Sequence, residues 1–512
     1  MLTIALILAV LPIFMVILLL LLRIPPHIIS SVALAIGVLE LFYFHTPLVV
    51  VLYSEESALF TAAEVAMIIL GGILLYEIIK ACTIDQTLAE WFATLSKDPT
   101  RLALLTVLGI TPFMESVTGF GVGAIFAIPL LQRMGFKPEK AAILGLLGYV
   151  AVPWGALGPG TLVAARITGI SFQTLGVVSA FISLPLFLIA GCSALIIAGG
   201  LKALKRLDEL VILSFSLWGG ILITNIVFGT PLAGVFGSMV SIATGVAIIL
   251  IREKRRIPYS RELIRITSPY GILVVLLLTS RLVYYGTTLF HPGLLTGATI
   301  VSVVLESPAT WLLATSYYGT TLFHPGLLTG ATIVSVVLES PATWLLATSL
   351  ITVILLKQKK EVLVQAGRNA ITRWWRVAFT TFCFLALGYL MVASGMTGII
   401  AGNLTQLGRG YLLMVPFIGA LGGLLTGSNT GANAMFAQQQ AEAASGIGYS
   451  KLWVVGIQNV SASLFTMASG PRIQLAMSLF DGKDKDISVF RTVFLIDVMV
   501  ALTMIIVLFL RT

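Results

Sequence analysis

The apolar runs of this 512-residue chain are interrupted in two places by clustered Gly, Ser, Thr and Asn: Pro112-Phe-Met-Glu-Ser-Val-Thr-Gly-Phe-Gly-Val-Gly123 and Pro416-Phe-Ile-Gly-Ala-Leu-Gly-Gly-Leu-Leu-Thr-Gly-Ser-Asn-Thr-Gly-Ala-Asn433. Inside a bilayer, irregular backbone survives only where protein or a water-filled cavity satisfies its amides and carbonyls. Paired breaks at corresponding places of two halves are typical of the midplane binding site of a secondary transporter. The two stretches therefore predict a helical membrane carrier with a solute site between its halves.

Composition agrees with a protein that faces lipid. The chain is 58% hydrophobic and only 10% charged, with a mean hydropathy of +1.03, whereas soluble globular proteins carry about 25% charged residues. Apolar runs long enough to cross a bilayer recur along the whole length, and no polar stretch is large enough for a soluble domain. We predict an all-α polytopic integral membrane protein of the plasma membrane, with about 12–14 transmembrane helices.

The basic residues gather in short loops beside apolar runs, which is the pattern of the positive-inside rule. The net charge of +9 therefore indicates membrane orientation and not a nucleic-acid partner. Three loops are expected to be cytoplasmic: Lys202 to Arg206, Arg252 to Arg265, and Lys357 to Arg376. The three cysteines are isolated in apolar segments, so we expect no disulfide framework, metal site or cofactor: Cys82, Cys192 and Cys383.

The direction of the chain across the membrane follows from these loops. The run 1–22 has no basic flank and no cleavage site, so we expect a retained first span with Arg23 inside. Successive candidate spans include 28–52, 58–80, 138–165 and 452–469. The basic loops fall on the cytoplasmic side only if each interrupted segment adds one crossing, in opposite directions. This alternation, which also places Lys483 and Lys485 inside, predicts an inverted repeat.

The domain organisation follows from that repeat. We expect a first half at 1–206 with a broken or re-entrant segment at 112–134, and a second half at 357–512 with a broken segment at 416–445. Residues 207–268 are expected to form connecting helices and a basic cytoplasmic loop. A faint sequence echo supports the repeat: Thr118-Gly119, Gly135-Phe136, Gly145 and Gly158-Pro159 recur in order as Thr426-Gly427, Gly448-Tyr449, Gly456 and Gly470-Pro471.

A second repeat is of a different kind. Residues 284–316 recur without a change as 317–349 within the segment 269–356. Structural repeats diverge and number three or more, so a recent duplication or a sequence-assembly error explains this copy better. Because both flanking basic loops are expected inside, it adds either zero or two crossings, and we expect an outward loop or re-entrant element. His291 and His324 are thus one histidine counted twice.

Several windows resemble the lactate permease family of proton-coupled monocarboxylate carriers. They are Glu115-Ser-Val-Thr-Gly-Phe-Gly121, Gly135-Phe-Lys-Pro138, Gly427-Ser-Asn-Thr-Gly-Ala-Asn433, and the segment from Asn459 to Pro471. The resemblance implies import of L-lactate or related 2-hydroxy acids, such as glycolate and D-lactate, by proton symport. A runner-up is a carrier of another small organic anion, possibly one coupled to sodium.

The chain departs from the family pattern at five places. Asn429 stands where the family has an acid, and Val122-Gly123 stands where a proline is usual. Met467 replaces a lysine, while Arg472 and Arg166 both replace glutamine. These changes suggest that the anion site of this chain has been rebuilt.

The candidate proton carrier is Glu115, because a carboxylate within a membrane is expensive to keep and marks a functional site by default. The alternative is that Glu115 caps a helix N-terminus. Glu64 is the second candidate among the lone acids of the apolar runs.

The candidate substrate-binding residues supply hydroxyl and amide groups at the two breaks, and a guanidinium directly after Pro471, the end of the last window of the resemblance. Half-helix N-termini in such breaks direct their positive ends at anionic substrate groups, and a guanidinium pairs with a carboxylate through two hydrogen bonds. The alternatives are close helix packing for the small residues and an interfacial position for the arginine. The set is Thr118, Ser428, Asn429, Thr430, Asn433 and Arg472.

An integral-membrane enzyme is the rival of another class. It would need a nucleophile beside a base, or a metal cluster, and neither pattern occurs in the chain. The expected partners are a small organic anion, a coupling proton or sodium ion, and the lipid bilayer.

Overall fold

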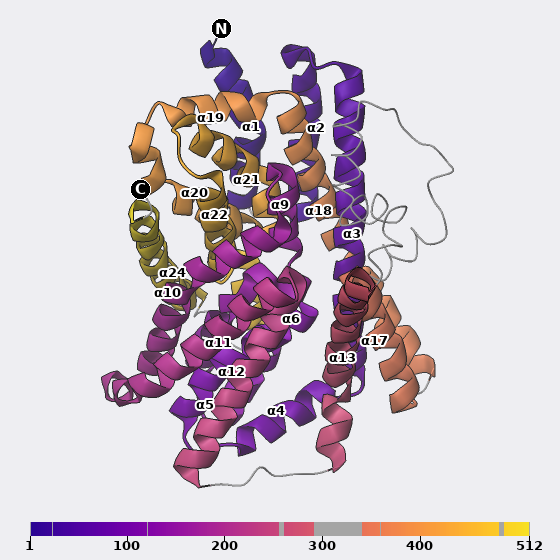
Figure 1. The fold of residues 1–512 in the computed structure, drawn as a ribbon, viewed down its shortest axis with the longest axis vertical. Coiled ribbons are helices and arrows are strands. Elements are labelled where there is room, and N and C mark those ends of the chain that lie inside the picture. The colour runs from indigo at the N-terminus through magenta and orange to yellow at the C-terminus, as the bar shows by residue number, and fades with distance from the viewer. Residues whose placement is uncertain are drawn as a thin grey trace.

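The computed structural model describes residues 2–22, 24–119, 121–254, 261–290, 340–358, 360–480 and 486–510 (Figure 1). Regular structure in these residues is helical throughout. Thirteen of their helices are long and apolar enough to cross a membrane. The expected all-α polytopic membrane protein is confirmed.

The order of helices repeats between the two halves. Each half opens with a 34-residue helix, continues with a short helix, and then breaks a span twice in succession. The first half comprises α3 (Leu48–Ala81), α4 (Ile84–Thr94), α5 (Pro99–Leu105), a π-helical turn η1 (Thr106–Ile110), α6 (Thr111–Thr118), α7 (Val122–Arg133), α8 (Pro138–Leu147), η2 (Gly148–Leu157), α9 (Pro159–Thr168) and α10 (Phe172–Gly199). The second comprises α18 (Lys360–Ala393), α19 (Met396–Thr405), η4 (Gly408–Leu413), α20 (Val415–Thr426), α21 (Asn429–Gly446), α22 (Lys451–Phe465), α23 (Gly470–Met477) and α24 (Asp486–Phe509).

The two long helices α3 and α18 pack against each other in opposite directions. Near one end, Arg373 of α18 bonds to Glu77 of α3 at 2.7 Å. Near the other, the Ser54 hydroxyl of α3 donates to the Tyr389 carbonyl of α18 at 2.8 Å. Residue numbers fall along α3 as they rise along α18, so these equivalent helices are antiparallel. This is the relation that an inverted repeat requires.

The sequence echo marks equivalent structural positions. α6 ends at Gly119 with φ +67°, and α20 ends at Gly427 with φ +62°. Both glycines lie in left-handed conformations that a side chain would strain. The prolines of the last pair, Pro159 and Pro471, both lie in the first turn of a short helix, where a missing N–H costs nothing.

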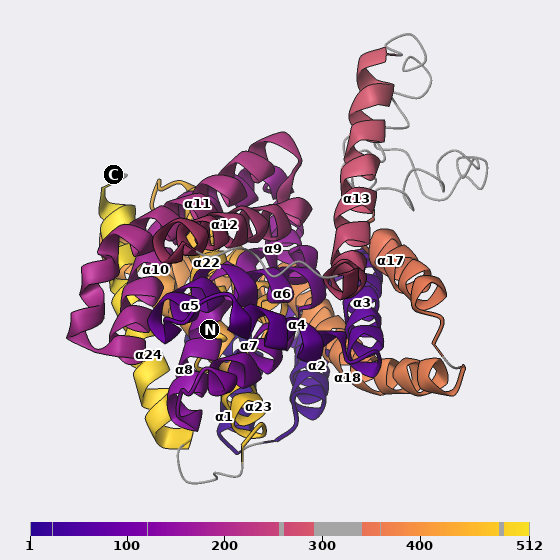
Figure 2. The same ribbon diagram turned by 90° about the horizontal axis from the view of Figure 1, so that it is seen from below.

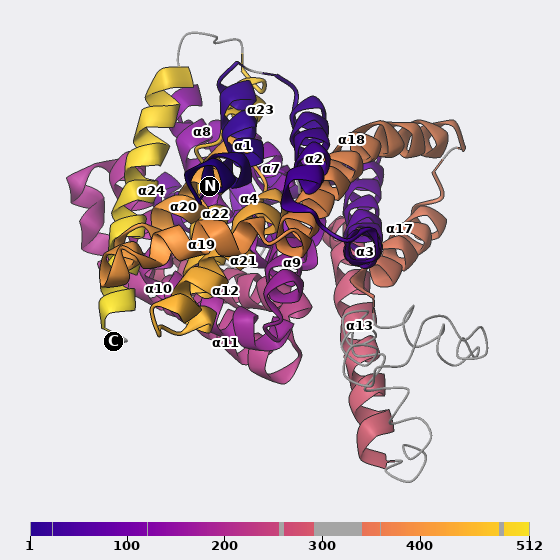
Figure 3. The ribbon, with the colours of Figure 1, turned by 90° about the horizontal axis from the view of Figure 1, so that it is seen from above.

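The remaining helices flank or connect the halves. α11 (Leu207–Val227) and α12 (Thr230–Glu253) follow the short η3 (Leu201–Arg206) and join the first half to the second. α13 (Arg261–Phe290) and α17 (Pro341–Leu356) lie at one flank beside α3 (Figures 2 and 3). α1 (Leu2–Leu21) and α2 (Pro26–Phe44) precede α3.

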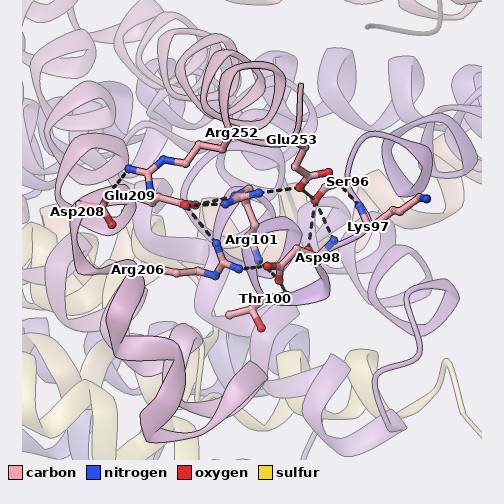
Figure 4. A network of polar contacts seen from close by, with 10 residues as sticks. All are labelled: Ser96, Lys97, Asp98, Thr100, Arg101, Arg206, Asp208, Glu209, Arg252 and Glu253. Atoms are coloured by element: carbon pink, nitrogen blue, oxygen red, sulfur yellow. Dashed lines mark hydrogen bonds and ion pairs between the residues drawn. The ribbon is translucent and has the colours of Figure 1, made fainter. Parts of the chain in front are cut away.

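A network of ion pairs holds α5, the first part of the broken helix in the first half, against the connecting helices α11 and α12 (Figure 4). Arg101, at the start of α5, donates two 2.8 Å bonds to Glu209 of α11 and a 2.7 Å bond to Glu253 of α12. Arg206 bridges Glu209 and Asp98, and the Asp98 side chain caps α5. Removing one partner of a buried pair leaves an uncompensated charge, so the network fixes α5 relative to α11 and α12.

The structure corrects the sequence prediction in two respects. The predicted spans 28–52 and 58–80 were wrongly divided: the chain turns at Pro47, a residue suited to a helix start, and α3 then continues unbroken through Glu55. The predicted span 138–165 is also interrupted, because Gly155 and Ala156 are non-helical before α9. The predicted span 452–469 ends at Phe465, and residues 466–469 lead into the short helix α23, which was not predicted. The protein therefore has four breaks where two were expected.

Some predictions lie outside the described residues. They concern Arg23, the part of the basic loop at 255–260, the segment 291–339 that holds most of the duplication with His291 and His324, and the lysines Lys483 and Lys485.

Candidate functional site

The four breaks bring four half-helix N-termini together. α7 begins after Gly121, α9 after Gly158, α21 after Ser428 and α23 after Ser469. A Cβ on Gly121 would lie 2.5 Å from Nη1 of Arg472 at the start of α23. A Cβ on Gly160 of α9 would lie 2.5 Å from Nδ2 of Asn429 at the start of α21. Glycine at these two positions lets the helix starts of opposite halves approach each other.

A cavity of about 730 Å³ lies at this meeting point. Its floor contains five of the seven predicted site residues, and its other end reaches His27 of α2 and the basic residues Arg373 and Arg376 of α18. The predicted residues that line it are Glu115, Ser428, Asn429, Thr430 and Arg472.

The electrostatics of the cavity favour an anion. Each helix N-terminus carries a partial positive charge and unpaired N–H groups, and such ends bind carboxylates and phosphates. The starts of α9, α21 and α23 line the cavity beside Arg472, and the start of α7 contacts Arg472 at Gly121 and is capped by Glu115. Glu115 is the one carboxylate among the described residues that line the cavity.

Glu115 both faces the cavity and caps a half-helix. Its carboxylate accepts backbone N–H bonds from Gly121 at 3.2 Å and from Gly123 at 3.2 Å, at the start of α7. The side chain is 4% exposed and pairs with Nη2 of Arg472 at 3.4 Å. The two sequence interpretations of Glu115, a functional acid and a helix cap, thus describe one geometry.

Tyr149 of η2 holds Arg472 in place. The guanidinium carbon lies 4.8 Å from the centre of the Tyr149 ring, a cation–π distance. Nη1 of Arg472 is also 3.4 Å from the Tyr149 hydroxyl, which donates to the Gly121 carbonyl at 2.8 Å. Arg472 is therefore anchored across the two halves.

Behind the cavity, a buried amide network fixes Asn429. Asn459 of α22 accepts bonds of 2.9 Å from both Asn429 and Asn433 on α21. Its own amide donates to Thr161 of α9 and to Ser179 of α10, each at 3.0 Å. Asn459 thus links four helices. The sequence analysis used it only as a marker of resemblance, although an amide inside an apolar span is itself a signal, because burying one without partners costs energy.

Two predicted substrate-binding residues lie outside the cavity lining. The Thr118 hydroxyl donates to the Met114 carbonyl of its own helix at 2.6 Å. Asn433 is fully buried and donates to Asn429, Asn459 and the Gly160 carbonyl. In this conformation both residues support the site from behind.

Ser428 and Thr430 form the start of α21. The Ser428 side chain caps the helix by accepting from the Gly431 N–H at 3.3 Å. Thr430, two residues after Ser428, lines the cavity. Arg166, the other unexpected arginine, pairs with Glu64 away from the cavity. Within the described ranges, no group of three His, Cys, Asp or Glu side chains is arranged to hold a metal ion.

Comparison with known proteins connects this geometry to transport. The L-lactate permease family matches residues 5–512. An L-lactate permease of Escherichia coli K12 is 25% identical over 90% of this chain and 87% of its own length. An L-lactate permease of Streptococcus iniae is 24% identical over 78% of this chain and 81% of its own. A glycolate permease, GlcA of Escherichia coli K12, is 24% identical over 92% and 89% respectively.

Proposed function

The chain belongs to the L-lactate permease family, and from this premise we propose that it imports L-lactate or a related 2-hydroxy monocarboxylate together with a proton. Membership makes it a multi-pass transporter of the plasma membrane. The observation that carries the finer proposal is the Glu115–Arg472 pair at the meeting point of four half-helix N-termini.

The substrate carboxylate binds at Arg472 and the adjacent helix N-termini. A guanidinium offers two parallel N–H bonds to a carboxylate, and the surrounding N–H groups add a positive potential. The 2-hydroxyl of the substrate then bonds to Asn429 or Thr430, which offer donors and acceptors beside the anion. Glycolate and both lactate enantiomers share these two groups.

Proton coupling follows from charge balance at Arg472. With the cavity empty of solute, the guanidinium and the Glu115 carboxylate neutralise each other. A bound monocarboxylate adds a second negative charge against the single guanidinium, and an extra charge at this depth is costly. Protonation of Glu115 removes that charge, so one proton travels with each anion.

The cavity mouth faces the cytoplasm in this proposal. His27, Arg373 and Arg376 line it, and the basic loop that leads into α18 is expected inside by the positive-inside rule. The described conformation then corresponds to an inward-open carrier.

Counterflow in proteoliposomes tests the proposal. Liposomes loaded with L-lactate, D-lactate, glycolate, acetate or succinate are diluted into labelled L-lactate, and uptake is then driven separately by a proton and by a sodium gradient. We expect counterflow with the 2-hydroxy acids, weaker counterflow with acetate, and accumulation driven by protons alone. Accumulation driven only by sodium would support the sodium-coupled alternative, and no counterflow with any 2-hydroxy acid would reject the substrate class.

A further inference from the structure

A second ion pair, partly buried, lies on the far side of the cavity. Arg166, near the end of α9, pairs with Glu64 of α3, and their side chains are 5% and 23% exposed. The Tyr389 hydroxyl of α18 lies within range of the Arg166 charge. The pair therefore joins the long helix α3 to a half-helix that begins at the cavity.

The position of the Arg166–Glu64 pair relative to the cavity can be located along each of three helices. On α9, Pro159 and Gly160 line the cavity, and Arg166 lies six residues further along, roughly 9 Å at 1.5 Å per residue. On α3, Ile73 lines the cavity, and Glu64 lies about 13 Å away, in the direction opposite to Glu77. On α18, Phe384 lines the cavity, and Tyr389 lies on the side away from Arg373. The pair is thus opposite the open mouth.

A packed apolar layer separates the pair from the cavity. Ile69 on α3, Val163 on α9 and Leu387 on α18 each lie between a cavity-lining residue and the pair, and all three belong to one buried cluster. On the same side, Gly388 packs so closely against the Ala434 carbonyl that no side chain fits there. This side of the carrier is closed, and the Arg166–Glu64 pair lies beyond the closure.

Arg166 has unused binding capacity. Among the described residues, its Nε and Nη1 have no hydrogen-bond partner although both atoms are buried. Buried donors are normally satisfied, and leaving them unpaired is costly. Glu64 engages only Nη2, so both two-donor edges of the guanidinium, Nε with Nη2 and Nη1 with Nη2, become available when Glu64 leaves.

We propose that Arg166 is a second anion-binding station, at which the substrate carboxylate displaces Glu64 before the closed side opens toward the central cavity. Once Glu64 leaves, Nη2 and the unpartnered Nε present two parallel N–H groups to the carboxylate, and displacement of Glu64 releases the contact that holds α9 to α3. Arrival of the anion thereby promotes opening on the side from which it came. This inference rests on the proposed function, because it takes the same monocarboxylate as its ligand.

The test is a KM measured from each face in proteoliposomes of determined orientation, with L-lactate as the probe. R166Q should raise the KM from the Arg166 face by roughly ten-fold or more, the effect of losing a charged hydrogen bond, and leave the KM from the mouth face unchanged. E64Q should lower the KM from the Arg166 face, because the competing carboxylate is gone. The double variant E64Q/R166Q should behave like R166Q.

A purely structural ion pair gives a different pattern. Both single variants would then impair transport in the same direction, and the neutral double variant would restore it, which would overturn the station. An unchanged KM in R166Q would also overturn it. R133Q, at the half-exposed Arg133–Glu90 pair on the surface, is the matched control. If the wild type shows no counterflow, both the proposed function and the station fail. If the wild type transports L-lactate but the variants follow the pattern of a structural ion pair, the proposed function stands and only the second anion-binding station is rejected.

Discussion

Glu115→Gln should separate accumulation from exchange. The wild-type carboxylate accepts the Gly121 and Gly123 N–H groups and pairs with Arg472. Glutamine keeps an acceptor oxygen for the start of α7, so the broken helix retains its cap. It loses the charge that competes with the substrate for Arg472, and it loses the proton-binding oxygen. Uphill uptake should therefore disappear, while substrate exchange continues.

The magnitude follows from the pair that is lost. A hydrogen bond to a charged group contributes about 1.5–3 kcal/mol, which corresponds to roughly ten- to hundred-fold in affinity. In the wild type the substrate must compete with the Glu115 carboxylate for Arg472, whereas in E115Q it does not. The KM for L-lactate counterflow should fall by up to that factor, and the accumulation ratio under an imposed pH gradient should fall to about one.

The two assays are made on the same proteoliposomes. E90Q is the matched control, because Glu90 is 63% exposed and pairs with Arg133 on the surface, so both readouts should remain as in the wild type. Uphill uptake by E115Q at the wild-type level would refute the proton-carrier role. Loss of counterflow in a folded E115Q protein would show that the acid serves binding and not coupling.

Three further outcomes are expected. Thr430→Ala should raise the KM by about five-fold, the value of one hydrogen bond near 1 kcal/mol, without lowering the melting temperature in detergent; Asn429→Ala should do both, because Asn429 also bonds to Asn459. Deleting 317–349 should leave uptake intact, since residues 308–316 supply the same sequence at the start of α17; loss of uptake in a properly inserted protein would make the second copy an integral part of the carrier. Burial raises the pKa of Asp85, in α4 outside the membrane-spanning helices, so the folded state binds this proton more tightly than the unfolded chain does. Stability should fall as pH rises from the usual carboxyl pKa through the raised one, and D85N melting curves should lack that decrease.

Much of the fold class could be predicted because it depends on local properties. Hydropathy and run length determine which segments can cross a bilayer, and clustered Gly, Ser and Asn determine where a membrane helix cannot continue. The same local signals identified Glu115, Ser428, Asn429 and Thr430 as candidates, and the departure from the family pattern after Pro471 identified Arg472; all five line the cavity.

The local sequence could not predict that the side chains of Thr118 and Asn433 lie outside the cavity lining. Both are polar and lie beside a break, as the cavity-lining residues do. Which way a side chain points depends on the rotation of its helix against neighbours distant in sequence, and Asn433 is directed at Gly160 and Asn459. The break before α9 was also missed, because its flanking residues are apolar enough to read as one continuous span. The helix α23 was missed because it is only eight residues long and too short to cross a bilayer.

The sequence by itself determined the membrane class, the two polar breaks and the internal echo, since each depends on the composition of one contiguous segment. Only the tertiary structure decided that four half-helices meet at one cavity, that Arg472 pairs with Glu115, and that Arg166 lies on the closed side with Glu64. These partners are separated by about one hundred to more than three hundred residues. The antiparallel packing of α3 and α18 brings such residues together, and no property of a single segment contains that packing.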